Sequence, residues 1–383
     1  ASLRQPVRKP TPRAPKVHPT TGLPLSKARG QHILHNKGVL YKMVEAADIR
    51  STDSVYEVGC GTGELTMQLL QLAREVHTVD VEQRMVEETL HRAEAEGYAD
   101  RLHTSVGDAL RLPMPRRFDI CVSNLPYQIS SPFIFQLLRR ISTGQPWRYA
   151  VLMLQREFAD RLLADPGEKP YSRLALSVRL FARSVRLFDV RPGSFIPQPQ
   201  VHSTVVRLEP RIPAPDVNFR EWDGLIRLIF SRRRKTLRAQ FKKISTVSML
   251  EQNYKLRCSF SGQSTAKLPF PQLVNSVLEE EGLLSERAYA MDIEDIYGLL
   301  RAFHRKGIYF SDLHDPRGED GQLLSEDWDG DESSDELIPL ASMRPGRQPA
   351  SATPPRQVPS APPVPPRPGP TSPRGPEGLL SYP

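Results

Sequence analysis

The residues with the clearest capacity for chemistry form the tetrapeptide Asn124-Leu125-Pro126-Tyr127, placed where an apolar strand should end. An exocyclic aromatic amine is a weak nucleophile, because its lone pair is conjugated into the ring. Two hydrogen-bond acceptors aimed at its N–H groups favour the geometry needed for attack. The amide oxygen of Asn124 and a main-chain carbonyl near Leu125 or Pro126 offer such acceptors, and Tyr127 can stack on a flipped-out base. By itself the tetrapeptide is also compatible with an ordinary turn.

A glycine-rich loop, GCGTG, follows an apolar strand and opens a helix. Gly59 and Gly61 let the backbone approach a ligand closely. Glu57, on the preceding strand, would repel a pyrophosphate but suits the cationic, phosphate-free S-adenosylmethionine. Asp80 ends the second strand, where it can accept from ribose hydroxyls, and Asp108 follows the third, where it can accept from an adenine amine. The sequence therefore predicts S-adenosylmethionine as the cofactor.

The elements that must position these residues follow a regular order. From Ser54 onward, apolar strand-like segments alternate with amphipathic helical ones, a pattern typical of a parallel sheet covered by helices. Helical periodicity is found at 63–73 and 83–97, and two further β-rich segments, at 184–190 and 202–210, are expected to complete the sheet. The first five strands are expected at 54–58, 75–79, 102–106, 118–122 and 149–154.

Composition narrows the class of partner. A net charge of +8 and a pI near 9.4 favour a polyanionic partner, with nucleic acid as the first candidate. Cys60, Cys121 and Cys258 lie far apart, without the paired spacing of a zinc site or a disulfide framework, so we predict structural thiols and no metal site. No apolar run approaches the length of about 18 residues that spans a membrane, so no membrane partner is expected.

A second, smaller domain is expected after the proline cluster at 209–217, where the sequence becomes helical and basic up to about Phe310. Its most basic stretch is SRRRKTLRAQFKK, at 231–243. With helical spacing, these cations would project from one side of a helix and contact RNA phosphates, although a solvated helix face is the ordinary alternative. The RNA-binding residues that we predict are Arg232, Arg233, Arg234, Lys235 and Arg238.

The two ends of the chain have a different composition. Residues 1–44 contain Arg and Lys but no Asp or Glu, which fits a flexible RNA-binding arm or an organellar transit peptide. Several prolines disfavour the amphipathic helix of a transit peptide, so we prefer the arm. Residues 312–383 are first acidic and then proline-rich, and they are expected to be disordered. Within them, PPVPPR at 362–367 fits a ligand for a proline-rich-motif reader of the Src-homology-3 type.

The stretch from Gly30 to Ser311 resembles the ribosomal RNA adenine N6,N6-dimethyltransferase family, most closely its eukaryotic nucleolar branch. The matching motifs occur in order and include GQHIL, EVGCGTGELT, GDAL, SNLPYQISSPF, SFIPQPQVHSTVVRLEP, WDGLIRLIFSRRRKTL and MDIEDIYGLL. Two departures from the family pattern stand out. Cys60 replaces the proline that is usual between the first two glycines, and Asp80 with Glu82 replaces the usual Glu followed by Asp.

This resemblance implies an α/β fold: a Rossmann-like S-adenosylmethionine-dependent methyltransferase domain with a small C-terminal helical domain and a disordered tail. The implied boundaries are a flexible basic arm at 1–29, the methyltransferase domain at 30–210, a small helical RNA-binding domain at 217–311 and the acidic, then proline-rich tail at 312–383. The agreement with the alternating pattern of strands and helices supports these expectations.

The resemblance also implies roles for individual residues. The segment with Gln31, His32 and Leu34 closes over the cofactor, and Phe195 forms a second aromatic wall beside the target base. The implied catalytic residues are Asn124, Leu125, Pro126, Tyr127 and Phe195. The implied cofactor-binding residues are Gln31, His32, Leu34, Glu57, Gly59, Gly61, Asp80, Val81, Asp108, Ala109 and Asn124.

The implied activity is dimethylation of two adjacent adenosines near the 3′ end of small-subunit rRNA, coupled to biogenesis of that subunit. The enzyme is expected to act as a monomer on a pre-ribosomal particle in the nucleolus, or in mitochondria or another organelle if residues 1–29 are a transit peptide. Two other hypotheses stay open. One is an assembly factor whose binding matters more than its methylation, and the other is a DNA adenine or protein glutamine methyltransferase, which shares the chemistry of the turn.

Overall fold

The structure is a computed structural model that describes residues 16–17, 24–25, 32–262 and 264–311. The chain divides into two compact units, Ala1–Leu323 and Leu324–Pro383, and all described residues belong to the first. Gln31, most of the predicted arm and the whole predicted tail with its polyproline motif lie outside the described residues. Among the described residues, no helix is both long enough and apolar enough to cross a membrane.

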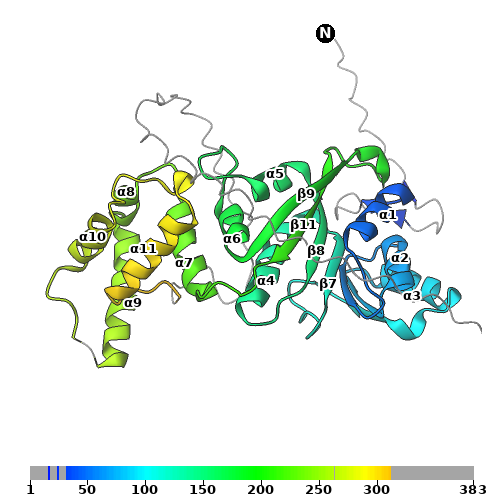
Figure 1. The fold of residues 1–383 in the computed structure, drawn as a ribbon, viewed down its shortest axis with the longest axis horizontal. Helices are drawn as coiled ribbons and strands as arrows, with labels where there is room; N and C mark the ends of the chain where they lie inside the picture. The colour runs from blue at the N-terminus through cyan, green and yellow to red at the C-terminus, as the bar shows by residue number, and fades with distance from the viewer. Residues whose placement is uncertain (1–15, 18–23, 26–31, 263, 312–383) are drawn as a thin grey trace, which may run out of the picture. The chain divides into compact units, whose positions relative to one another are not determined.

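A seven-stranded sheet runs in the order β6-β5-β4-β7-β8-β11-β9 (Figure 1). The first five strands in this order are parallel, and β11 pairs antiparallel with both β8 and β9. Strand β4 is buried along its whole length, as expected where helices cover both faces of a sheet. The strands are β4 (Ser54–Val58), β5 (Glu75–Asp80), β6 (Leu102–Val106), β7 (Ile120–Asn124), β8 (Tyr149–Gln155), β9 (Ala182–Val190) and β11 (Ser203–Pro210).

The predicted α/β fold is confirmed, and each of the seven predicted strands is present. The strand expected at 118–122 begins later, at Ile120, and ends on Asn124. The reason is Asp119, which acts as an anchor before the strand: its carboxylate accepts from the N–H of Ser54 at 2.8 Å, and its own N–H donates to the carbonyl of Ser54 at 2.8 Å. This shift places Asn124 at the carboxyl end of the sheet.

Helices cover the two faces of the sheet in two groups of three. Side chains alternate between the faces along β4, so Val55 packs with α1, α2 and α3, whereas Tyr56 packs with α4, α5 and α6. The connection from β6 to β7 contains Pro113 and Pro115 and forms no helix. The bounds are α1 (Lys37–Ala46), α2 (Glu64–Leu72), α3 (Gln83–Ala95), α4 (Ser130–Ser142), α5 (Arg156–Leu163) and α6 (Arg173–Phe181).

Short elements complete the sheet region. β3 (Ile33–Leu34) pairs antiparallel with β10 (Phe195–Ile196), which fastens the segment before α1 to the segment before β11. Within the predicted arm, β1 (Lys16–Val17) pairs antiparallel with β2 (Pro24–Leu25). Single 3₁₀ turns are η2 (Ala99–Arg101), η3 (Tyr127–Ile129) and η4 (Pro192–Ser194).

The remaining helices follow the sheet and share its larger apolar core. Trp222 is fully buried, and its indole N–H donates to the hydroxyl of Ser177 on α6 at 3.3 Å. Tyr171 is equally buried and donates to the carbonyl of Met291 at 3.1 Å. A continuous core therefore joins the two parts. The elements are α7 (Phe219–Phe230), α8 (Leu237–Phe241), α9 (Ile244–Ser261), α10 (Phe270–Glu280), η5 (Ala288–Ala290) and α11 (Ile293–Arg305).

Glu221, on α7, holds the last described segment of the chain. Its buried carboxylate accepts from the N–H of Phe310 at 2.6 Å and of Ser311 at 2.9 Å, and it pairs with His304 at 3.1 Å. Burial alone would raise the pKa of Glu221, but the hydrogen bonds from His304 and Ser311 outweigh it and lower the pKa. The ionised carboxylate thus ties the segment after α11 back onto α7.

Gly224 lies on the same helix and contacts this segment too closely for a side chain. A Cβ atom at this position would overlap the carbonyl oxygen of Phe310. We predict that Gly224→Ala lowers the free energy of unfolding by about 1–3 kcal/mol, although Ala favours helices over Gly. The matched control is Gly298→Ala in α11, where a Cβ would lie 3.9 Å from its nearest neighbour and should stabilise by up to about 1 kcal/mol. Urea unfolding of both variants tests this, and equal stability would contradict it.

Candidate active site

A cavity of about 150 Å³ lies at the carboxyl ends of β4, β5 and β7. Open α/β sheets place their ligand sites at this edge, where the order of the strands reverses. In this sheet the reversal falls between β4 and β7, which carry the glycine loop and Asn124. The predicted site residues that line the cavity are His32, Leu34, Gly61, Asp80, Val81, Asn124, Leu125, Pro126 and Tyr127.

The glycine loop depends on backbone conformations that favour glycine. Gly59 has a φ of 81° and Gly61 a φ of 53°, both in the left-handed region. The N–H of Gly59 donates to the carbonyl of Val79 at 2.7 Å, and a Cβ at this position would touch the ring of Pro126 at 3.4 Å. The loop is therefore pressed between β5 and the turn after β7, which brings the two predicted motifs together.

Asp80, at the end of β5, ties the glycine loop to the next turn. Its Oδ2 accepts from the N–H of Gly61 at 3.1 Å and its Oδ1 from the N–H of Glu82 at 2.9 Å. Burial raises the pKa of Asp80, while these two backbone hydrogen bonds act in the opposite direction. Oδ2 also accepts from the Cys60 thiol at 3.9 Å, so Oδ1 is the oxygen that keeps a lone pair, and through it the side chain can serve the loop and a ligand together.

Glu57 lies beneath the loop and is 1 % exposed. Its Oε2 accepts from the hydroxyl of Thr66 at 2.7 Å, whereas its buried Oε1 has no hydrogen-bond partner among the described residues. Burial, reinforced by the nearby charge of Asp80, raises the pKa of Glu57 to about 8. Glu57 does not line the cavity. The structure therefore places this predicted cofactor ligand under the loop, where it is largely protonated at neutral pH.

The orientation of the Asn124 amide is determined by a backbone carbonyl. Its Nδ2 lies 3.1 Å from the carbonyl oxygen of His32, which can only accept, so the amino group must face His32. The amide oxygen is then directed away from His32. The carbonyl of Pro126 accepts from the N–H of Ile129 at 3.1 Å, which leaves the carbonyl of Leu125 as the better second acceptor of the turn.

The position of Tyr127 is fixed by its hydroxyl, which shares a hydrogen bond of 2.8 Å with the hydroxyl of Ser203. Partial burial raises its pKa, so the phenol is neutral at physiological pH. Its ring centroid lies 6.0 Å from that of His32, at an angle of 31°. His32 is fixed in turn, because its Nδ1 lies 2.7 Å from the carbonyl of Pro197 and therefore donates to it.

Besides Glu57, four predicted catalytic or cofactor-binding residues in the described part of the chain do not line the cavity: Gly59, Phe195, Asp108 and Ala109. Phe195 is 2 % exposed and packs in the core beside Leu34, so it forms no aromatic wall in this structure. Asp108 caps its own turn by accepting from the N–H of Leu110 at 2.9 Å, and Ala109 is buried in the core of the opposite face. Phe195, Asp108 and Ala109 follow or precede short elements, and the direction of their side chains depends on packing that the motif does not encode.

Seven cavity residues were not predicted as ligands. Their positions next to the motifs are visible in the sequence, but Leu40, Leu65 and Met85 are apolar helix residues that look like ordinary core residues. Glu64 and Glu82 add acidic character near the loop, where Arg92 pairs with Glu64 at 2.9 Å and Arg84 with Glu82 at 2.5 Å. The seven are Ile33, Leu40, Cys60, Glu64, Leu65, Glu82 and Met85.

The basic stretch does not form the continuous helix that its spacing suggested. Residues 231–235 form turns between α7 and α8. Arg233 is half-buried and donates to the carbonyls of Tyr171 and Lys169, the latter at 3.1 Å, so it braces the loop before α6. The other predicted RNA-binding cations are exposed: Arg232, Arg234, Lys235 and Arg238.

Comparisons with known proteins identify the family. A family model described as "Ribosomal RNA adenine dimethylase" matches residues 25–267, which is more than half of the chain. A "Probable dimethyladenosine transferase" of Drosophila melanogaster is 45% identical over 291 residues, covering 76% of this chain and 94% of the relative. A "Ribosomal RNA small subunit methyltransferase" of Arabidopsis thaliana is 46% identical over 253 residues, covering 66% of this chain and 70% of the relative.

A solved structure extends the similarity to the fold. The crystal structure of a dimethyladenosine transferase from Plasmodium falciparum superposes with a TM-score of 0.68 at 44% sequence identity, covering 73% of this chain and all of that chain. The family match at 25–267 includes the sheet, the glycine loop and the turn after β7. The chain therefore belongs to the ribosomal RNA adenine dimethylase family and is an rRNA adenine dimethyltransferase.

Proposed function

We propose that this enzyme uses S-adenosylmethionine to dimethylate the N6 amines of two adjacent adenosines near the 3′ end of small-subunit rRNA, within a pre-ribosomal particle. The observation that carries this proposal is the Asn124 amide, whose oxygen is directed away from His32 at the edge of a cavity. The name of the Arabidopsis relative supports the choice of the small subunit. The same activity links the enzyme to small-subunit biogenesis and to the nucleolus.

The cavity suits a cationic cofactor that carries a ribose. Asp80, Glu64 and Glu82 line it with carboxylates, which favour a sulfonium and disfavour a pyrophosphate. Gly61 also lines the cavity, and because it has no side chain, a ligand can approach its backbone directly. When bound, S-adenosylmethionine supplies an electrophilic methyl group. Asp80 would hold the ribose, and His32 with Leu34 would cover the ligand from the β3 side.

The residues of the turn then act on the substrate amine. The Asn124 amide oxygen and the Leu125 carbonyl accept its two N–H groups, which draws the nitrogen toward a tetrahedral geometry. Tyr127 stacks on the flipped-out adenine and keeps it beside the acceptors, an interaction worth about 1–3 kcal/mol. After the first transfer one N–H remains, so one acceptor still orients the amine for the second. No strong base is required, because the methylated ammonium readily releases a proton to water.

The test is methyl transfer from labelled S-adenosylmethionine to purified small ribosomal subunits that lack the modification. Nuclease digestion followed by mass analysis should reveal dimethyladenosine, and reverse-transcription stops should map it to two neighbouring positions. DNA and a glutamine-containing protein serve as alternative acceptors in parallel reactions. Product on those acceptors and none on rRNA would overturn the proposal, whereas RNA binding without product would favour an assembly factor.

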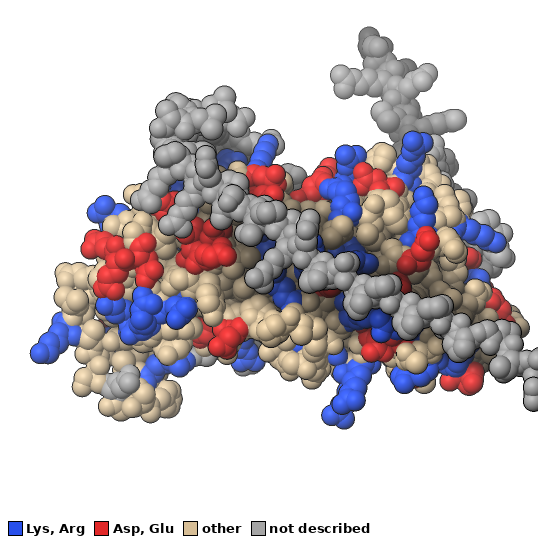
Figure 2. Space-filling model, in the orientation of Figure 1, with Lys and Arg blue, Asp and Glu red and all other residues tan. Residues whose placement is uncertain are grey.

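We also propose that the exposed cations beside α8 bind rRNA phosphates. On the face of the molecule in Figure 2, basic and acidic side chains are mixed, so a local group of cations matters more than the net charge. We predict that reversing Arg232, Arg234 and Arg238 to Glu weakens RNA binding and reduces the slope of log K against log salt by about 2. Arg233 is left unchanged because it braces Tyr171 and Lys169.

The matched control for this prediction replaces the same three arginines with lysine, which keeps the charge. We expect the lysine variant to retain the salt dependence of the wild type, as measured by filter binding over a range of salt concentrations. Reversal without any loss of affinity would show that RNA is bound elsewhere.

We also propose that the chain divides into domains at 30–210 and 217–311 and that it acts as a monomer. We propose in addition that its tail binds a proline-rich-motif reader.

A further inference from the structure

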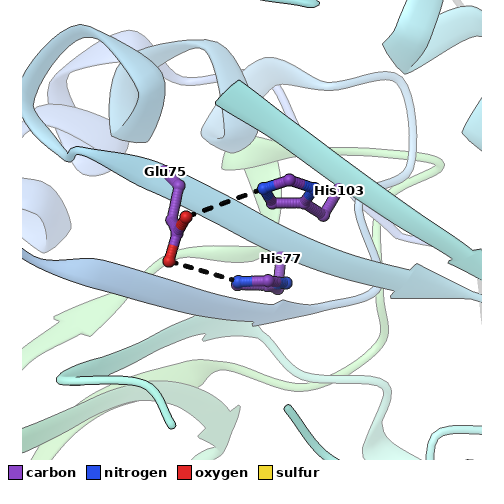
Figure 3. Close-up of side chains that lie close together, drawn as sticks. All are labelled: Glu75, His77 and His103. Atoms are coloured by element: carbon purple, nitrogen blue, oxygen red, sulfur yellow. Dashed lines mark ion pairs between the residues drawn. The ribbon is translucent and has the colours of Figure 1, made fainter. Parts of the chain in front are cut away.

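Three metal-ligating side chains outside the active site meet on one face at the edge of the sheet: Glu75, His77 and His103 (Figure 3). Glu75 and His77 lie two residues apart on β5, so their side chains leave the same face of the strand. His103 is the direct partner of His77 in the parallel register of β5 and β6. The register of two strands therefore assembles a group that sequence spacing does not reveal.

The Glu75 carboxylate faces both imidazoles. Its Oε1 lies 3.5 Å from Nε2 of His77 and its Oε2 lies 3.7 Å from Nε2 of His103, as the dashed lines in Figure 3 mark. All three ligand atoms lie within 4.8 Å of one another. A tetrahedral zinc ion with bonds of about 2.0–2.2 Å separates neighbouring ligand atoms by about 3.4 Å. The two imidazole rings are stacked, with centroids 4.6 Å apart at an angle of 23°, so the histidine side chains must rotate to direct both nitrogen lone pairs at one ion.

The group is accessible because a helix is missing from this part of the sheet. The connection from β6 to β7 contains Pro113 and Pro115 and forms turns, so it does not cover the face that carries the two histidines. The Glu75, His77 and His103 side chains are 27%, 28% and 50% exposed. An ion can therefore enter from solvent, and a water molecule can complete its coordination.

The Glu75 carboxylate has one oxygen available for an ion. Arg74 donates to Oε1 at 2.7 Å, so Oε2, the oxygen that faces His103, remains for the ion.

We propose that Glu75, His77 and His103 bind one divalent transition-metal ion of the Zn²⁺ class, with water as the fourth ligand. Two imidazoles and one carboxylate suit zinc, whereas Mg²⁺ prefers an octahedral shell of oxygen ligands. Such an ion would tie the edge strand β6 to β5. β5 ends at Asp80, and the N–H of Gly107, directly after β6, donates to the carbonyl of Asp80 at 2.9 Å. The ion would thus stabilise the edge of the sheet next to the cofactor site.

The test compares zinc binding by the full chain and by single variants after removal of metal with a chelator. Glu75→Gln and His103→Gln each remove one ligand, and His91→Gln removes an exposed histidine on α3 outside the group. Equilibrium dialysis with elemental analysis gives the zinc bound per chain. Thermal unfolding with Zn²⁺ or Mg²⁺ gives the stabilisation that follows from binding to the folded state.

We expect both ligand variants to bind one zinc ion fewer than the wild type, or to bind it more than about tenfold more weakly. The His91→Gln variant should bind as the wild type does. Zinc, but not magnesium, should raise the melting temperature of the wild type and not that of the ligand variants. Equal zinc content in the wild type and in both ligand variants would overturn the proposal. His103 is half exposed, so its replacement should fold, which an unchanged melting temperature without metal would verify.

Discussion

Asn124→Ala is expected to lower the rate of methyl transfer about 10²- to 10³-fold while leaving RNA affinity nearly unchanged. The substitution removes the amide oxygen that we propose as an acceptor for the substrate amine, and a preorganised polar group of this kind typically contributes that much to a transition state. Single-turnover transfer to small subunits measures the effect. Saturating substrate isolates the chemical step from binding.

The control for this variant addresses the second role of Asn124, its hydrogen bond to the carbonyl of His32. Cofactor affinity, measured by calorimetry, shows whether loss of that bond has loosened the segment over the cavity. Asn218→Ala is the matched variant, because it deletes the same side chain at the N-cap of α7, far along the chain from the turn. Its cost of about 1 kcal/mol should affect stability and not transfer. A fully active Asn124→Ala enzyme would refute the assigned role.

Glu57→Gln is expected to change how stability depends on pH. The pKa of Glu57 is raised from its ordinary value of 4.5 to about 8, so between these values the folded protein holds a proton that the unfolded chain releases. Stability from this group is therefore complete below about pH 4.5 and is lost as the pH rises toward 8. The wild type should lose on the order of 3 kcal/mol of unfolding free energy from pH 5 to pH 8 relative to Glu57→Gln.

Urea unfolding at several pH values measures this difference. Burial raises the pKa of Asp80 as well, so the wild-type curve contains more than one contribution, and only the difference between variants reports on Glu57. Glu45→Gln, at an exposed position on α1, is the matched control for the same change of side chain. If the curves of the wild type and Glu57→Gln run parallel between pH 5 and pH 8, Glu57 is ionised in the folded protein.

Local features of the sequence were sufficient to predict the strands of the sheet and the residues in the central part of the candidate site. The strand from Ser54 contains Val55, Tyr56 and Val58 and ends at the glycine loop, and the strand that begins with Ile120 ends on Asn124. Both signals arise within a few residues of chain, because a left-handed turn needs glycine and a buried strand needs apolar side chains. The cavity at the carboxyl ends of β4, β5 and β7 then follows from the parallel order of the strands.

Tertiary packing decided what these local signals could not. Phe195 faces the core because β10 pairs with β3, and Arg233 binds the carbonyls of a loop some sixty residues earlier in the chain. Glu75 and His77 meet His103 only through the register of β5 and β6. The sequence by itself therefore determined the class of fold, the glycine loop and the turn after β7. Contacts between distant segments determined where the remaining side chains point, because such contacts depend on the whole packed chain.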